Sequence, residues 1–417
     1  MNGRGLISIA VLLVASCIAG GSARAQTPQT TQPLPPPQLC VNARCETTQS
    51  TPPHSGQAIK WNPGHYMASY AVLFPGDSIS KVQSEMDDLN NQDAILGYRI
   101  LITWGALEPT PGNYDFSLVD AILQRLKTQY NKPKRLVILL WTYSQGMHRN
   151  NKGSIIPQYI QEDAKYGASP VAGSFGWWGQ NSKGVSTGMY APALYYPPVM
   201  DRFIGMVQAL GKHLDGDPNV EALFIQENST IAQAAANLGS VDPHYGDDAW
   251  LTQQERLLSA STAAFPHTSV TMGNSYFVQP APTVALEQWM ANNRIAMGSA
   301  DTLGQTAIDA HGTSILSDGI QAYLGVHPSS KVDLRPKMTA MMDIEGPDMY
   351  TPYFKMYGGP WTPLDLINDL NKTIQASHAF WTHLTGPDIP SEVQWPNLAA
   401  TCAAHPLTRT AYPANYP

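Results

Sequence analysis

"GYRILITWGALEPTPGNYDFSLVDAIL", residues 97–123, sets an apolar run before a short polar loop and an amphipathic segment. The run at 97–104 is almost continuously apolar, which is typical of a strand that is buried on both faces. From 117 to 130 the apolar residues recur at helical spacing, so a helix is predicted there. The stretch therefore predicts one strand–loop–helix unit of an α/β fold.

The same unit recurs along the chain. The strand-like runs are residues 65–73, 97–104, 135–143, 220–227, 268–276, 305–312, 337–345 and 378–384. Amphipathic segments that predict helices lie between them, at 117–130, 199–214, 250–265 and 364–377. Eight alternations over roughly 330 residues predict a single (β/α)8 barrel, with a doubly wound open sheet as the alternative.

The ends of the chain have a different composition. Residues 1–25 carry an early Arg4, an apolar stretch and small residues before Ala25, which predicts a cleavable secretory signal. An alternative is lipidation at Cys17 in "VASC", so we expect a secreted or periplasmic protein, or an outer-membrane lipoprotein. Residues 26–57, rich in Pro, Thr and Gln, predict a linker or strap. The barrel is expected over 58–390, and a tail packing on it over 391–417.

Charge and cysteine content exclude some partners. Without residues 1–25, 23 basic residues (25 less Arg4 and Arg24) face 32 acidic ones, a net charge of −9, which argues against nucleic acid or an anionic membrane. No later stretch is long and apolar enough to predict a transmembrane helix. Cys40, Cys45 and Cys402 leave the disulfide pairing open and form no zinc pattern. We expect a monomer that needs no metal or organic cofactor.

Polar and aromatic residues mark the ends of the strand-like runs. They are Arg99, Trp104, Trp141, Tyr143, Gln226, Glu227, Asn274, Tyr276, His311, Glu345 and Trp381. Because chemistry in such barrels sits at the carboxyl ends of the strands, these residues should form one site. Glu227 and Glu345 end the fourth and seventh runs, which face each other across a barrel mouth. Two carboxylates among aromatic residues are what the cleavage of a glycosidic bond requires.

One segment resembles a known family. Its matching residues are Arg99, Trp104, Glu108, Pro109, Gly112, Tyr114, Asp115 and Phe116, in that order. The pattern is similar to the second strand and following helix of clan A glycoside hydrolases, the retaining (β/α)8 enzymes that include families 5, 39 and 42. The resemblance implies Glu227 as acid/base and Glu345 as nucleophile. It also implies Trp381 beneath the reactive sugar and His311 near the nucleophile. Gln226 departs from the family, which usually has Asn before the acid/base.

Competing interpretations accompany several of these residues. Asp343 and Asp348 compete with Glu345, and Asp343 is expected one layer lower, with a structural partner. Arg99 is either a buried ion-pair member or the cation that keeps Glu345 ionised. Glu108 is expected to be a turn residue and not a catalyst. For Trp381 the alternative is a core tryptophan.

The connection after the third run, residues 144–198, is long enough to indicate a functional loop. Trp177 and Trp178 within it are expected to wall a cleft, because aromatic rings stack on the apolar faces of sugars. The sequence thus predicts a secreted retaining glycoside hydrolase acting on a β-linked polysaccharide or oligosaccharide. The alternatives are a transglycosylase and a catalytically silent carbohydrate-binding or envelope-assembly protein. Sugar type, linkage and endo or exo action do not follow from the sequence.

Overall fold

The computed structural model describes most of the chain beyond residue 57. The described residues are 39–41, 44–46, 58–142, 155–167, 177–180, 186–190, 192–225, 244–273, 280–299, 317–346, 349 and 361–416. The predicted signal, residues 1–25, and Cys17 lie outside them. The chain divides into two units, Met1–Gln49 and Ser50–Pro417. In the first, β1 (Leu39–Val41) pairs with β2 (Arg44–Glu46) in antiparallel fashion, with Cys40 opposite Cys45.

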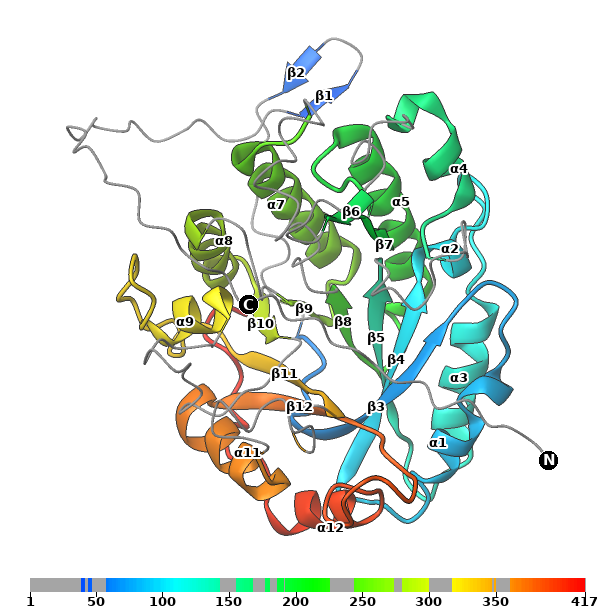
Figure 1. The fold of residues 1–417 in the computed structure, drawn as a ribbon, viewed down its shortest axis with the longest axis vertical. Helices are drawn as coiled ribbons and strands as arrows, with labels where there is room; N and C mark the ends of the chain where they lie inside the picture. Colours follow the sequence, from blue (N-terminus) through cyan, green and yellow to red (C-terminus); the bar gives the residue numbers. More distant parts are fainter. Residues whose placement is uncertain are drawn as a thin grey trace. The chain divides into compact units, whose positions relative to one another are not determined.

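The second unit is built on a closed parallel barrel (Figure 1). Its strands in chain order are β3 (Gly64–Leu73), β4 (Ile95–Thr103), β5 (Arg135–Trp141), β8 (Val220–Ile225), β9 (Ser269–Gly273), β10 (Ile295–Ser299), β11 (Ala340–Ile344) and β12 (Ala376–Thr382). Each strand pairs in parallel with the next, and β12 pairs with β3 to close the ring. The predicted (β/α)8 barrel is therefore confirmed, and the open sheet is excluded.

One predicted strand is wrong. The sixth strand of the barrel is β10, Ile295–Ser299, and not residues 305–312, which lie outside the described residues. Only Asn293 and Arg294 separate β10 from the preceding helix, and Arg294 takes the left-handed conformation at φ 60°. A strand of only five residues that follows a helix so closely reads in sequence as more helix, whereas 305–312 has the length and composition expected of a strand.

The four segments predicted as helices are helical, except that 364–377 ends in β12, which begins at Ala376. Other helices of the structure, such as Pro280–Asn292, were not predicted. The helices of the described residues fall into two groups by length. The long ones are α3 (Ser117–Thr128), α5 (Pro197–Leu214), α7 (Asp247–Ala264) and α8 (Pro280–Asn292), and the shorter ones are α1 (Gln83–Asp87), α2 (Trp104–Leu107), α4 (Gln158–Glu162), α9 (Asp318–Leu324), α11 (Pro363–Asp369) and α12 (Asn397–Ala404). Thr362 and Asp365 form a capping box at the start of α11, and a π-helical turn, Leu370–Ile374, follows that helix.

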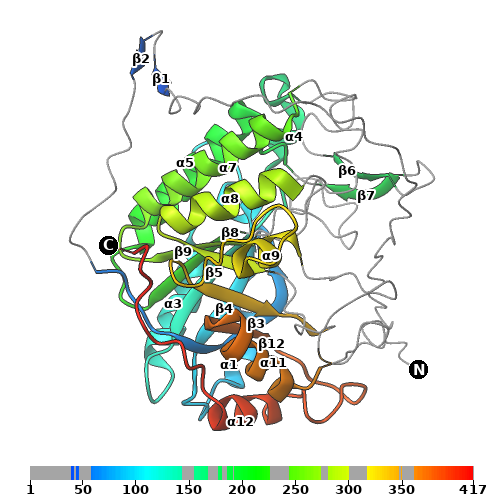
Figure 2. The same ribbon diagram turned by 90° about the vertical axis from the view of Figure 1, so that its left-hand side faces the viewer.

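The helices pack closely on the flank formed by α5, α7 and α8, which lie side by side in Figure 2. Gly211 allows the approach of α5 to α7, because a Cβ at this position would lie 2.4 Å from the carbonyl oxygen of Ala264. None of the helices that the structure describes is both long and apolar enough to cross a membrane.

The connection from β5 to α5 is as long as predicted. It carries α4, the 3-10 turn Ala164–Tyr166 and an antiparallel hairpin of β6 (Trp177–Gln180) with β7 (Ser186–Tyr190). In this hairpin Trp177 pairs with Tyr190 and Trp178 with Met189. The backbone of both tryptophans is thus placed in a strand, while their side chains are outside what the structure describes.

Two layers of side chains form the core. The barrel interior is filled by one cluster that includes Tyr66, Val137, Phe224, Met341 and Phe380. Strand residues of the opposite parity join the helices in a larger cluster around the barrel. Because neighbouring residues of a strand face opposite sides, membership of one cluster or the other shows which residues can point into the barrel.

Candidate active site

Glu345 lies at the carboxyl end of the barrel. It follows Ile344, the last residue of β11, and is half-buried. Met341 belongs to the interior cluster, so alternation along β11 puts Asp343 and then Glu345 on the same side as Met341. The hydroxyl of Thr382 on β12 donates to the carbonyl of Ile344 at 3.0 Å and fixes the strand just before Glu345. Glu345 therefore directly follows the seventh strand at the carboxyl end of the barrel, and the alternation of β11 predicts that its carboxylate faces the mouth.

Beneath it lies a buried ion pair. The guanidinium of Arg99, on β4, donates through Nη1 to Oδ2 of Asp343. Both side chains are buried, and the guanidinium lies over the Phe380 ring, 5.8 Å from its centroid. Asp343 thus has the structural partner predicted for it, two residues before Glu345. Arg99 is only 3% exposed, which fits the predicted ion-pair alternative and not direct contact with substrate.

Trp141 is placed to contribute to the mouth. It is the last residue of β5 and half-buried, and it packs against the interior cluster. Tyr143 follows two residues later and lies outside the described residues. Of the predicted aromatic site residues whose side chains the structure describes, Trp141 alone combines a strand-end position with partial exposure.

Trp381 is a core side chain and does not offer a sugar platform. It is fully buried in the layer between the barrel and the helices, and its indole N–H donates to Nδ1 of His65 at 2.9 Å. His65 Nε2 lies 3.0 Å from the carbonyl oxygen of His405, just after α12. An indole can only donate, so His65 Nδ1 accepts and Nε2 carries the proton. Burial lowers the pKa of His65 to about 4, so the ring is neutral at pH 7.

Trp104 is likewise buried, because it starts α2 and packs on the Phe203 ring with centroids 5.0 Å apart. Its indole N–H donates to the carboxylate of Glu108 at 2.9 Å. Glu108 is fully buried, accepts the Gly112 backbone N–H at 2.8 Å and pairs with Arg202. Glu108 therefore organises the turn after the second strand, as predicted. The Trp104–Glu108 spacing of four residues was the only sequence signal of this network.

Several predicted site residues lie outside the described residues. They are Gln226, Glu227, Asn274, Tyr276 and His311. β8 ends at Ile225 and β9 at Gly273, so Gln226 and Asn274 come next in the chain after strands four and five. His311 loses the strand-end position expected for it, because the sixth strand ends at Ser299.

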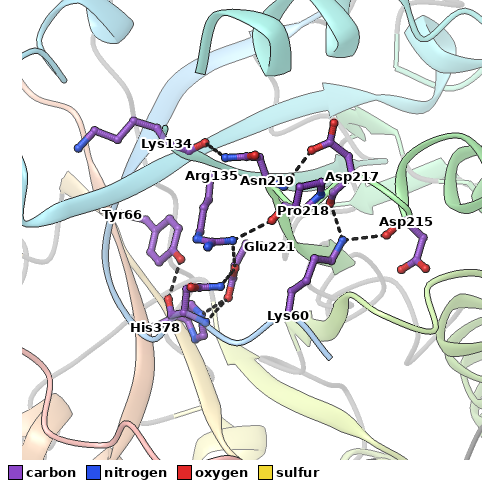
Figure 3. Close-up of polar contacts among 11 residues, drawn as sticks. Lys60, Tyr66, Lys134, Arg135, Asp215, Asp217, Pro218, Asn219, Glu221 and His378 are labelled. Atoms are coloured by element: carbon purple, nitrogen blue, oxygen red, sulfur yellow. Dashed lines mark hydrogen bonds and ion pairs between the residues drawn. The ribbon is translucent and has the colours of Figure 1, made fainter. Parts of the chain in front are cut away.

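A group of charged residues, some of them buried, lies at the other end of the barrel (Figure 3). Glu221, near the start of β8, accepts the Asn62 backbone N–H at 2.7 Å and the Asn62 amide at 2.8 Å, and meets His378 at 3.2 Å and Arg135 at 3.4 Å. Burial alone would raise the pKa of Glu221, but His378, Arg135 and the Asn62 N–H bring it below its usual value. Ser377 lies 2.8 Å from His378 Nδ1, which completes a Ser–His–Glu row.

This row is not an active site. Ser377, His378 and Glu221 are all fully buried, so no substrate reaches them. Beside them Lys60 donates to the carbonyls of Asp215 and Asp217 at 3.0 and 2.9 Å (Figure 3), and burial lowers the pKa of Lys60 to about 8. In such barrels, contacts at the amino ends of the strands serve stability and not catalysis. Among the residues that the structure describes, no group of three or more His, Cys, Asp or Glu could hold a metal ion.

Comparison with known proteins gives a likeness in structure alone. No family model matches the sequence, and no curated protein matches it. The GH5_18 structure from Streptomyces cattleya in complex with Manb1-4GlcNAc is similar at a TM-score of 0.50, with 10% identity over 82% of this chain and 80% of that chain. The shared feature is the barrel. This is the fold that the resemblance of residues 97–123 predicts.

Two other solved structures are similar at lower scores. The β-mannanase from the blue mussel Mytilus edulis has a TM-score of 0.45 and 11% identity, with 84% of this chain and 96% of that chain covered. Endo-glycoceramidase II from Rhodococcus sp. has a TM-score of 0.49 and 14% identity, with 83% and 80% covered.

Proposed function

We propose that this protein is a retaining glycoside hydrolase in which Glu345 is the nucleophile and Glu227 the acid/base. The observation that carries the proposal is the strand order of the closed barrel. Glu227 comes two residues after the fourth strand and Glu345 one residue after the seventh. In this proposal the carboxylates that follow these two strands supply the two groups that the reaction needs.

The mechanism follows from these roles. A Glu345 carboxylate oxygen attacks the anomeric carbon while Glu227 gives its proton to the leaving oxygen, so the glycosidic bond breaks and a glycosyl ester forms. Glu227, now ionised, takes a proton from water, whose oxygen displaces Glu345 and restores the original anomeric configuration. The Arg99–Asp343 pair supports this chemistry, because the cation neutralises the carboxylate two residues from Glu345.

The substrate in this proposal is a β-linked oligosaccharide or polysaccharide, and the protein acts outside the cytoplasm. The resemblance of residues 97–123 to clan A enzymes supports the first statement, and the predicted signal at residues 1–25 supports the second. Gln226 offers the same amide as the usual Asn one methylene further out, so it is the position at which we expect substrate preference to differ.

Turnover on a panel of plant and bacterial glycans tests the proposal. Glu227→Gln and Glu345→Gln should each lower kcat by about a thousandfold or more, whereas Glu392→Gln, an exposed glutamate after β12, should leave kcat unchanged. Proton NMR of the first-formed product should show the anomeric configuration of the substrate. Inversion would contradict the nucleophilic role of Glu345, and glycan binding without turnover by the wild type would favour a silent binding protein.

A further inference from the structure

The first barrel strand carries a bulge near the mouth. β3 is the longest strand of the barrel, and it pairs unevenly with β4, since Ala68 is opposite Arg99 and Val72 is opposite Leu101. Four steps along β3 thus match two along β4, which leaves two extra residues on β3. Bulges are common beside active sites, where they redirect a side chain.

Hydrogen bonds hold the bulge in shape. The Ser69 hydroxyl accepts the Ala71 backbone N–H at 3.0 Å and lies 3.2 Å from the Ala71 carbonyl oxygen, to which it donates. Ser69 itself is buried. The residue between them, Tyr70, is therefore presented by a defined turn of the strand and not by a long loop.

Tyr70 is exposed on a strand that is otherwise largely buried. It is 48% exposed, while five of the six residues before it on β3 are buried. The other exposed large apolar residues in the part of the chain that the structure describes are Val326, Val332, Leu364 and Tyr412. None of these lies on a barrel strand, so Tyr70 stands out as an aromatic ring that the barrel itself holds toward solvent.

The register relates Tyr70 to Glu345. Ile344 is opposite Trp381 on β12, so Glu345 comes level with Thr382, and Thr382 is opposite Ala68 on β3. Tyr70 is two residues beyond Ala68, toward the carboxyl end. β12 lies between β11 and β3, and two strand spacings amount to about 10 Å. A bound oligosaccharide spans that separation, whereas a single sugar held at Glu345 does not.

We propose that Tyr70 is a substrate-binding residue that stacks on a sugar unit next to the one held at Glu345. The inference rests on the proposed function for the position of the reacting sugar. Its basis is the buried Ser69 turn, the exposed ring and the register, together with the preference of flat sugar faces for aromatic rings. The substrate class is accordingly an oligosaccharide or polysaccharide that extends across strand one, and not a lone glycoside with a small leaving group.

The test compares Tyr70→Ala with Tyr70→Phe, and with Tyr412→Ala as a control tyrosine, 39% exposed in the C-terminal tail. On oligosaccharides of the glycan that the wild type cleaves, Tyr70→Ala should lower kcat/KM about tenfold, mainly through KM, because losing one aromatic stack costs about 1.4 kcal/mol. On an aryl monoglycoside it should have no effect. Tyr70→Phe keeps the ring and should behave as the wild type on both substrates, and so should Tyr412→Ala.

Calorimetric binding of the oligosaccharides to Glu345→Gln, with and without Tyr70→Ala, separates the two proposals. Suppose that Glu345→Gln abolishes turnover and that its glycan affinity is the same with and without Tyr70→Ala. This result would overturn the role of Tyr70 and still support the proposed hydrolase. A tenfold weaker affinity with Tyr70→Ala supports Tyr70 even if the wild type cleaves nothing. Failure of the wild type to bind or cleave any glycan of the panel would overturn both.

Discussion

His65 should make the stability of the protein sensitive to mild acid. The native state keeps this ring neutral down to about pH 4, whereas an unfolded chain protonates histidine near pH 6.5. Between these values the unfolded state binds more protons, so the free energy of unfolding falls as the pH falls from 6.5 to 4. At about 1.4 kcal/mol per pH unit, His65 alone accounts for a loss of about 3 kcal/mol.

The variant that isolates this contribution is His65→Asn, which can still accept the Trp381 N–H but does not titrate. At pH 7.5 it should be less stable than the wild type by about 1–3 kcal/mol, because the hydrogen bond to the His405 carbonyl is lost. Its stability should then fall less steeply below pH 6.5, so the two curves approach each other near pH 4. Urea unfolding followed by circular dichroism at half-unit pH steps measures both curves.

His405→Asn is the matched control, because it removes an exposed imidazole and keeps the backbone carbonyl that pairs with His65. Its curve should run parallel to that of the wild type. The reasoning is refuted if the His65→Asn and wild-type curves are also parallel between pH 7.5 and 4. It is equally refuted if NMR titration of the folded protein places the pKa of His65 near 6.5.

Three further changes have defined outcomes. Glu221→Gln removes the charge that His378 faces and should lower the free energy of unfolding by about 3 kcal/mol at pH 7. The unfolding entropy of roughly 360 residues is about 0.75 kcal/mol/K, so Tm measured by calorimetry should fall by about 4 °C. This difference should narrow as the pH falls below 4.5, because the folded carboxylate has the lower pKa. Asp343→Asn should likewise lower Tm, because it removes the carboxylate that pairs with the buried Arg99 charge. It should also lower kcat on the substrate of the wild type. Gly298→Ala should cost about 1–3 kcal/mol in urea unfolding, because its Cβ would lie 2.8 Å from the Met272 carbonyl and the Phe224 ring.

Strand or helix type followed from the sequence for elements with a regular pattern, whereas the long helix α8 was not among the predicted ones. Residues 97–104 and 117–130 correspond to β4 and α3 within a few positions, because burial on both faces and helical spacing each leave a clear pattern. The sequence did not predict β10, because this strand lacks such a pattern. It has five residues, and Gly298 is small to make room for Phe224 and not to satisfy strand propensity. Such a choice depends on a neighbour far away in the chain, which a local pattern does not contain.

The candidate site likewise has features that the sequence predicted and features that it did not. The order of the strands and the place of Glu345 after the seventh were predictable, because they depend only on counting the units. Which aromatic residues face the mouth was not. Trp381 and Phe380 are adjacent on β12, and one joins the outer layer while the other fills the barrel. Sequence alternation gives both faces but does not say which is the inner one.

The exposure of Tyr70 could not be predicted from the sequence for a related reason. In the run 65–73 it reads as an ordinary strand residue, and the two extra residues of the bulge appear only when β3 is aligned with β4. A bulge is a relation between two strands, so no pattern within one strand predicts it.

The two ends of the barrel also explain why buried charge was a poor guide to function here. Perturbed titratable groups usually suggest an active site, yet Glu221 and Lys60 lie at the amino end, where neighbours satisfy them and Glu221 is fully buried. Glu345 is half-buried at the opposite end. If the proposed function holds, Glu221→Gln should therefore change Tm and leave kcat/KM at 25 °C as in the wild type. A matching loss of kcat/KM in that variant would mean that the barrel base and the mouth are coupled, and that the two ends do not separate stability from catalysis.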